Sequence, residues 1–222
     1  MHSSFDILYE DEHLVVMDKP AWSVIHPTRG ADDAIVVVNT LAEQLGVPVY
    51  PVHRLDRQTS GVLLLAKNPE AARALSVEIR EGRMHKIYLG LCRGVIKESL
   101  RVDHPVRDEG VRRSASTDID PLEQFCNRYT LVCAKPLTGR RHQIRYHLKH
   151  VHHPLVGDVG YGHGDINRFF RSTFGLSRFF LHAQSLRILH PCHLQYLELS
   201  SPLPADLAEV LDKLRAYSGP VV

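Results

Sequence analysis

Hydrophobic spacing along the chain predicts eight strands. Short runs in which hydrophobic side chains follow one another, or recur at every second position, are typical of β-strands. Acidic residues 10–12 separate the first two runs, and a polar turn at residues 58–61 interrupts a later pair. The predicted strands are residues 5–10, 13–19, 49–56, 61–67, 85–94, 128–135, 179–188 and 193–199.

Helical spacing and end signals predict four helices, at residues 33–45, 69–81, 140–151 and 205–217. Asp32 or Asp33 is a suitable cap for the first helix, and Gly46 is suited to end it. Asn68 followed by Pro69 gives the second helix a cap and a preferred first residue. Strands and helices do not alternate strictly. This order favours an α+β fold with a mixed, largely antiparallel central sheet and flanking helices.

Two segments lack a sustained period of hydrophobic positions. Residues 103–123 are charged and contain proline, which predicts a flexible surface excursion. Residues 160–177 combine glycine with aromatic residues and predict a loop or lid. Most of the phenylalanines between 169 and 180 are expected in the core, although some of them have the chemistry to stack on nucleic-acid bases.

Composition describes an ordinary soluble globular protein. A chain of 222 residues with 44% hydrophobic and 23% charged residues forms one large domain or two intimate lobes, and is neither collagen-like nor disordered. The four cysteines have no C-x-x-C spacing, which predicts free thiols in a reducing compartment. No run resembles a signal peptide or a membrane span, so we expect a cytoplasmic location.

The small net charge of +2 conceals a basic segment. Residues 124–197 contain ten Lys or Arg and only two acidic residues, and they also hold nine of the fifteen histidines. A localised positive field is typical of a protein that binds a polyanion, and RNA or DNA is the commonest such partner. The alternative is a solvated basic surface without a partner.

One charged turn, residues 53–61, is a candidate for catalysis. Asp56 lies between Arg54 and Arg57 directly before the polar turn. Two neighbouring guanidinium groups stabilise the ionised form of a carboxylate, which suits a nucleophile or a base better than a proton donor. The alternative is an ordinary ion cluster on the surface.

A second motif, residues 137–150, predicts an anion site. Arg140 and Arg141 are expected in the first turn of a helix, where positive side chains oppose the helix dipole. A bound anion reverses that effect, and the phosphates of a nucleic acid are suitable anions. Arg145 lies one turn further on, beside the apolar positions of the helix, and is placed to reach inward.

No metal or cofactor is expected. The histidines between 142 and 153 have no cysteine or carboxylate at a spacing suited to a metal site. The chain also has neither a G-x-x-x-x-G-K-[ST] nor a G-x-G-x-x-G motif, so a nucleotide cofactor is unsupported.

Six separated blocks resemble the RluA family of pseudouridine synthases. The motif HRLDRQTSGVLLLAKN resembles the catalytic motif of that family, and LTGRRHQIRYHL resembles its T-G-R-x-H-Q-[IL]-R-x-H motif. The resemblance implies one catalytic domain over residues 1–222 without a separate S4-like domain, no cofactor, and isomerisation of uridine to pseudouridine in RNA. The blocks are residues 19–27, 53–68, 85–90, 137–148, 152–158 and 179–191.

The resemblance also implies roles for individual residues. Asp56 matches the essential carboxylate, which acts as a nucleophile or as a base. Tyr88 matches the tyrosine that stacks on the target base, and Arg145 matches the arginine that pairs with the aspartate. The remaining expected substrate contacts are Leu181 as an apolar pocket wall, Arg54 as the residue that enters the vacated base stack, and Lys19, Arg140 and Arg141 on the RNA backbone.

Residues 162–183 resemble the subfamily that modifies tRNA at a T-stem uridine next to the acceptor stem. Ribosomal RNA is the alternative substrate within the family. Trp22 departs from the pattern, because many members have a glycine shortly after the Lys-Pro pair.

Two other classes of function compete with a synthase. One is a non-catalytic RNA-binding module, and the presence of Asp56, Tyr88 and Arg145 together argues against it, because binding alone does not require them. A glycoside hydrolase requires a second carboxylate as its acid, and no other motif supplies one.

Overall fold

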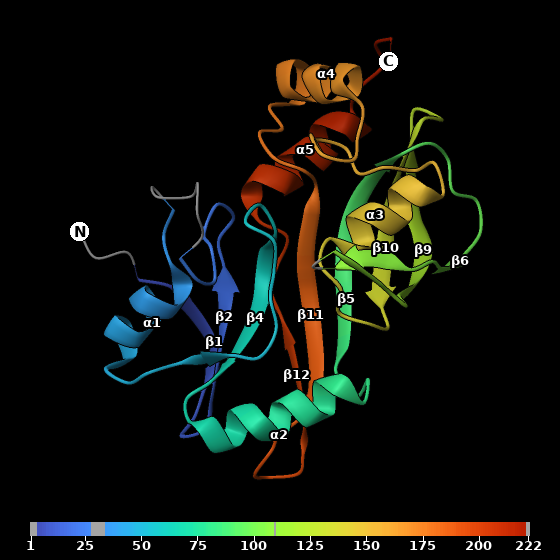
Figure 1. The fold of residues 1–222 in the computed structure, drawn as a ribbon. Helices are drawn as coiled ribbons and strands as arrows, with labels where there is room; N and C mark the ends of the chain where they lie inside the picture. The colour runs from blue at the N-terminus through green and yellow to red at the C-terminus, as the bar shows by residue number, and fades with distance from the viewer. Residues whose placement is uncertain (1–3, 28–33, 109, 221–222) are drawn as a thin grey trace. The chain divides into compact units, whose positions relative to one another are not determined.

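A computed structural model describes residues 4–27, 34–108 and 110–220 (Figure 1), and the chain divides into two compact units. The first unit comprises Met1–Lys86 with Ala183–Pro202, and the second comprises Ile87–His182 with Leu203–Val222. Each unit therefore combines one long earlier part of the chain with a short later segment. None of the helices in the described ranges is long and apolar enough to cross a membrane.

Antiparallel strands form the centre of the first unit. β2 (Leu14–Lys19) lies between β1 (Asp6–Glu10) and β4 (Ser60–Ala66), and the two-residue β3 (Tyr50–Pro51) also pairs with β4. β11 (Leu181–Leu189), most of which belongs to this unit, pairs with β12 (Tyr196–Ser200). Every residue of β4 is buried, which explains its unbroken hydrophobic run.

Two helices belong to the first unit. α2 (Pro69–Arg80) begins as predicted, because the Asn68 side chain accepts a hydrogen bond from the backbone N–H of Ala71, and it packs against β4 (Figure 1). α1 (Val37–Leu45) ends at Gly46 as predicted but begins later than expected. Val36 occupies the cap position without a side-chain bond, so the predicted aspartate cap is wrong. Residues 32 and 33 lie outside the described residues.

Strands of the second unit include the segment that was expected to be an excursion. β10 (Tyr129–Pro136) pairs antiparallel with β5 (His85–Arg93) on one side and with β9 (Ser116–Phe125) on the other, and β9 pairs with β6 (Leu100–Asp103). β7 (Val106–Asp108) and β8 (Val111–Arg113) form a separate hairpin. The prediction for 103–123 is wrong because cross-strand ion pairs neutralise its charges, as between Arg101 and Asp118 at 2.6 Å.

Three helices complete the second unit. α3 (Gln143–His150) lies against β9 and β10, and α4 (Gly164–Phe174) packs on α5 (Ala205–Arg215) (Figure 1). The prediction of a loop or lid at 160–177 is therefore wrong. Phe170 and Phe174 of α4 are buried with Leu207 and Leu211 of α5, so the aromatic residues belong to the core, as expected for most of them.

The α+β class with largely antiparallel strand pairing is confirmed. That both units act as a single catalytic domain stays a prediction.

Candidate active site

Asp56 lies in the loop between β3 and β4. Its main-chain oxygen accepts a hydrogen bond from the N–H of Thr59 at 3.0 Å, which closes a tight turn over residues 56–59. The predicted position of the turn, 58–61, is wrong by two residues, because Ser60 and Gly61 already belong to β4. Leu55 is buried, whereas Arg54 and Arg57 on either side are exposed and Asp56 is half-buried. A buried leucine thus anchors a loop that presents a carboxylate between two exposed guanidinium groups.

Lys19 holds this loop from inside. Its side chain is fully buried, and the Nζ atom donates to the main-chain oxygens of Thr59 at 2.8 Å, Pro20 at 2.9 Å and Arg57 at 3.4 Å. The prediction that Lys19 contacts the RNA backbone is wrong, because its ammonium group is enclosed by carbonyl oxygens. Its role in this unit is to join the end of β2 to the loop of Asp56.

His53 fixes the loop at its other end. Its Nε2 accepts a hydrogen bond from the backbone N–H of Leu64 in β4 at 3.0 Å. Burial, and then the charge of Lys86, lower the pKa of His53 to about 3, so the ring is neutral at physiological pH. A neutral imidazole bonded to β4 positions the start of the loop without adding charge beside Asp56.

Trp22 explains the departure from the family pattern. Its φ angle is 71°, in the left-handed region where glycine is the usual residue. The guanidinium carbon of Arg57 lies 5.7 Å from the centre of the Trp22 ring, and the backbone N–H of Trp22 donates to the Arg57 oxygen. A tryptophan therefore adopts a left-handed angle here, with a cation–π contact to Arg57.

Tyr88 and Leu181 lie in the second unit. Tyr88 is on β5 and Leu181 is the first residue of β11, and both are largely buried. Gly90, two residues after Tyr88, leaves room for Leu155 and Leu181, since a β-carbon there would lie 3.0 Å and 3.6 Å from their side chains. Because alternate strand residues share a face, Tyr88 lies on the face that Leu181 approaches.

Arg145 is held tightly within the second unit. Its Nε and Nη2 donate to the two carboxylate oxygens of Asp158, at 2.7 Å and 2.9 Å. Its guanidinium carbon lies 5.0 Å from the centre of the Tyr161 ring and 4.6 Å from that of Phe179. Only 11% of the Arg145 side chain is exposed, and none of the Asp158 side chain is. The prediction that Arg145 reaches inward is consistent with this burial.

Arg140 and Arg141 precede α3 and do not lie in its first turn. The helix begins at Gln143, and His142 before it has a left-handed φ of 55°. The Gln143 side chain organises the turn, because its Oε1 accepts from the backbone N–H of Arg140 at 3.0 Å and from the Thr138 hydroxyl. The predicted helix start is wrong because this side-chain bond replaces a regular first turn.

The β7–β8 hairpin adds positive charge near Arg140. Arg107 and Arg112 are exposed and directly opposite each other, an arrangement that repels. The Nε of Arg140 donates to the main-chain oxygen of Ser114 at 3.2 Å, next to exposed Arg113. These arginines lie outside residues 124–197, so the predicted basic segment did not include this part of the basic surface.

Three rings border the hairpin. The His104 ring stacks on that of His150, with centroids 3.7 Å apart, and on that of Tyr146 at 5.8 Å. Burial, then the charges of His150 and Arg112, lower the pKa of His104. The charge of Arg112 on the hairpin therefore acts on the His104 ring, as a smaller cause than burial.

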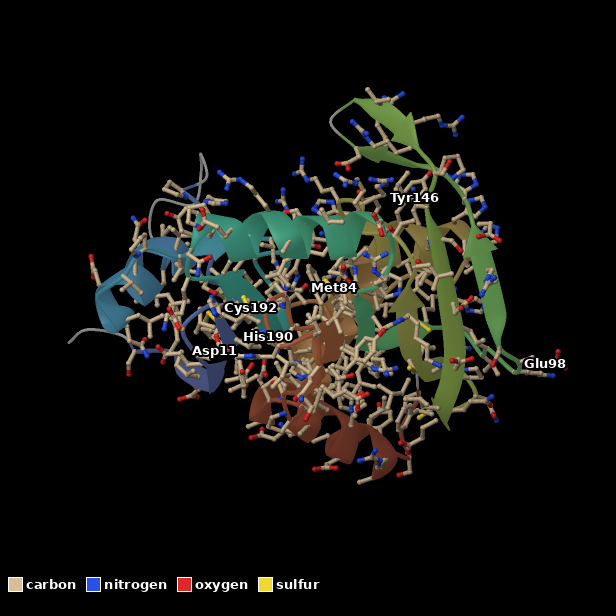
Figure 2. The ribbon with its side chains drawn as sticks, turned by 90° about the horizontal axis from the view of Figure 1, so that it is seen from below. Asp11, Met84, Glu98, Tyr146, His190 and Cys192 are labelled. Carbon is tan, nitrogen blue, oxygen red and sulfur yellow. The ribbon has the colours of Figure 1, made fainter. Side chains whose placement is uncertain are left out.

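A group of polar side chains in the first unit resembles a metal site but is already bonded. Ligand atoms of Asp11, His190 and His193 lie within 4.8 Å of one another, and Figure 2 shows Asp11 beside His190. Backbone N–H groups of Cys192 and His193 donate to Nδ1 of His190, so Nε2 carries the proton that it donates to Asp11 at 2.8 Å. His190 thus has no lone pair left for a metal, and these bonds tie two turns together.

The predicted site residues fall into two groups. The first unit brings together Arg54, Asp56 and the supporting Lys19, and the second holds Tyr88, Leu181, Arg140, Arg141 and Arg145. Asp158 was missed as a partner of Arg145, although it ends the block 152–158 that resembles the family. The predicted pairing of Arg145 with Asp56 stays a prediction.

Comparison with known proteins decides the family. A family model described as RNA pseudouridylate synthase matches residues 13–150. The tRNA pseudouridine synthase C of Vibrio cholerae is 36% identical over 237 residues, covering 96% of this chain and 96% of the relative. The chain belongs to the RNA pseudouridylate synthase family. Members isomerise uridine in RNA, so this pseudouridine synthase is an isomerase that acts on RNA.

Other relatives and solved structures agree with the assignment to the pseudouridine synthases. Relatives of the same name are 36% identical in Haemophilus ducreyi, covering 89% of this chain and 90% of the relative, and 37% identical in Pectobacterium carotovorum, covering 88% and 58%. The structure of human RNA Pseudouridylate Synthase Domain Containing 4 superposes with a TM-score of 0.77 at 25% identity, over 95% of this chain and 93% of that one. The structure of human RNA Pseudouridylate Synthase Domain Containing 1 superposes with a TM-score of 0.74 at 28% identity, over 99% of this chain and 98% of that one.

Proposed function

We propose that this pseudouridine synthase modifies tRNA at the T-stem uridine next to the acceptor stem. The observation that carries the proposal is the set of relatives named tRNA pseudouridine synthase C, which are 33% to 37% identical to it. The basic surface around α3 supports an RNA substrate, because phosphates neutralise positive side chains that otherwise repel one another. The reaction breaks the bond from N1 to C1′ and remakes it through C5, with no change in oxidation state.

Asp56 is the reacting carboxylate in this proposal. The buried Leu55 and the bonds of Lys19 hold its loop still while Asp56 itself remains partly accessible. The target uridine leaves its base stack to reach the carboxylate, at a cost of a few kcal/mol. Arg54 is exposed on the same loop and is suited to fill the vacated stack.

The second unit supplies the base pocket. Tyr88 stacks on the extruded uracil, and Leu181 forms an apolar wall on the face of the strand where Tyr88 lies. Arg145 pairs with Asp56 and orients it. Arg140 and Arg141 contact RNA phosphates as flanking residues of α3, together with the arginines of the β7–β8 hairpin.

A competition assay tests the choice of substrate. We expect the purified enzyme, given unmodified tRNA and ribosomal RNA fragments in one tube, to modify the T-stem uridine of tRNA first. Pseudouridine mapping of both RNAs at early times measures the preference. Equal or faster modification of the ribosomal fragments would exclude the tRNA proposal and leave the family unchanged.

The basic surface gives a separate prediction about affinity. Replacing Arg140 and Arg141 with Ala should weaken binding of modifiable and non-modifiable RNA about equally. The slope of log affinity against log salt should fall by roughly one for each lost phosphate contact. Filter binding between low and moderate salt measures both effects, while turnover at saturating RNA should change little.

A matched double variant controls for loss of charge. Arg73 and Arg80 are exposed on α2 of the first unit, so the R73A/R80A protein loses the same charge elsewhere. Its affinity and salt slope should resemble those of the wild type. Identical binding by both double variants would place the RNA away from Arg140 and Arg141.

A further inference from the structure

We infer that Asp158 is a positioning residue for the isomerisation, because it fixes the direction of the Arg145 guanidinium. The inference rests on the proposed pairing of Arg145 with Asp56. Asp158 lies in the block 152–158, which resembles the family but has no role in the function proposed above. Its side chain is fully buried beside Arg145 in the second unit.

Two parallel hydrogen bonds define the orientation. Nε of Arg145 donates to Oδ2 of Asp158 at 2.7 Å, and Nη2 donates to Oδ1 at 2.9 Å. A fork of this kind restricts rotation of the guanidinium plane, which a single bond does not. The direction of the third nitrogen, Nη1, is therefore set by Asp158.

Aromatic rings restrict the same plane. The guanidinium carbon of Arg145 lies 4.6 Å from the centre of the Phe179 ring and 5.0 Å from that of the Tyr161 ring. These contacts limit the movement of the guanidinium out of its plane, while the Asp158 fork limits rotation within it. Together they hold the charged end of Arg145 in one place.

The carboxylate of Asp158 is itself fixed. Its Oδ1 accepts hydrogen bonds from the backbone N–H groups of Gly160 at 2.9 Å and Tyr161 at 3.0 Å. The Asn167 side chain of α4 holds the main chain at residues 157 and 158. It accepts a hydrogen bond from the N–H of Gly157 at 2.8 Å and donates one to the main-chain oxygen of Asp158 at 2.9 Å. The segment that was predicted to be a lid thus supports the loop that holds Arg145.

A second forked ion pair lies in the same unit. Arg178 donates through Nε to Oδ2 of Asp206 at 2.7 Å and through Nη2 to Oδ1 at 3.1 Å, so its geometry matches that of the Arg145 pair. Neither residue is assigned to the site. The D206N variant breaks this second fork, whose carboxylate is half exposed and whose arginine also donates through Nη1 to the Leu181 main-chain oxygen at 3.5 Å.

Turnover and RNA affinity of five variants test the inference: D158N, D158E, D206N, R145A and the double variant D158N/R145A. In D158N the amide retains shape but places an N–H against a guanidinium N–H, and we expect kcat to fall by about 10- to 100-fold with the RNA Kd within about threefold of wild type. D206N should lose stability without this fall in kcat. In the R145A background, D158N should cause no further loss, because a residue that acts only through Arg145 has nothing left to position.

The D158E variant moves the carboxylate but keeps its charge, and it replaces D158N as the test if D158N fails to fold. Its carboxylate keeps the ion pair but is one methylene longer, so kcat should still fall. Wild-type turnover in D158N or D158E, or an equal additional loss from D158N in the R145A background, would overturn the inference while the role of Arg145 stands. Wild-type turnover in R145A would show instead that the proposed role of Arg145 is wrong, and the inference would fall with it.

Discussion

Asp56→Asn should reduce turnover by more than about a hundredfold while RNA binding persists or becomes tighter. The substitution keeps the size of the side chain and removes the negative charge that the proposed mechanism requires for nucleophilic or base catalysis. Binding is expected to survive because a carboxylate near phosphates repels them. Tritium release from RNA labelled at C5 of uridine measures turnover, and equilibrium binding measures affinity.

Asp212→Asn is the matched control for this prediction. Asp212 is exposed and forms an ion pair with Arg215 at 2.9 Å, so the variant makes the same chemical change beside an arginine outside the site. Its turnover should equal that of the wild type. An Asp56→Asn enzyme that retains more than about a hundredth of wild-type turnover would be incompatible with the role assigned to the carboxylate.

Gly61→Ala should lower the free energy of unfolding by about 3 kcal/mol or more. The φ angle of Gly61 is +110°, and a β-carbon at this position would lie 2.1 Å from the main-chain oxygen of Ala183. Main-chain atoms of β11 have no flexible end that can move aside, so β4 and β11 would have to separate within the first unit. Chemical denaturation followed by circular dichroism measures the change.

Gly82→Ala isolates the cost of the backbone angle. Gly82 also has a positive φ, +73°, but nothing lies within 4 Å of an added β-carbon. This control should cost only about 1 kcal/mol from left-handed strain. Equal losses in the two variants would show that the contact with Ala183 contributes nothing. Because Gly61 follows the turn that begins at Asp56, the Gly61→Ala protein should also lose turnover at temperatures where it remains folded.

Local signals in the sequence determined much of the secondary structure. Asn68 starts a helix by accepting a hydrogen bond from the N–H of Ala71, three residues on, and Pro69 suits the first helical position. Gly46 ends another helix because it tolerates a left-handed angle. Continuous hydrophobic runs such as β4 need no distant partner to be identified. Likewise, the family follows from short motifs with fixed order. Such features depend on residues a few positions apart, which is the range over which a sequence pattern specifies structure.

Contacts between residues far apart in the sequence determined the elements and side-chain partners that the sequence pattern did not predict. β9 is a strand because partners on β6 and β10 neutralise its charges, and residues 164–174 are helical because α5 buries their aromatic side chains. The Lys19 ammonium group faces loop carbonyl oxygens instead of solvent. Arg145 pairs with Asp158, which lies 13 residues further along the chain. Only folding specifies the direction and partner of a charged side chain, since burial removes the water that otherwise competes for its hydrogen bonds.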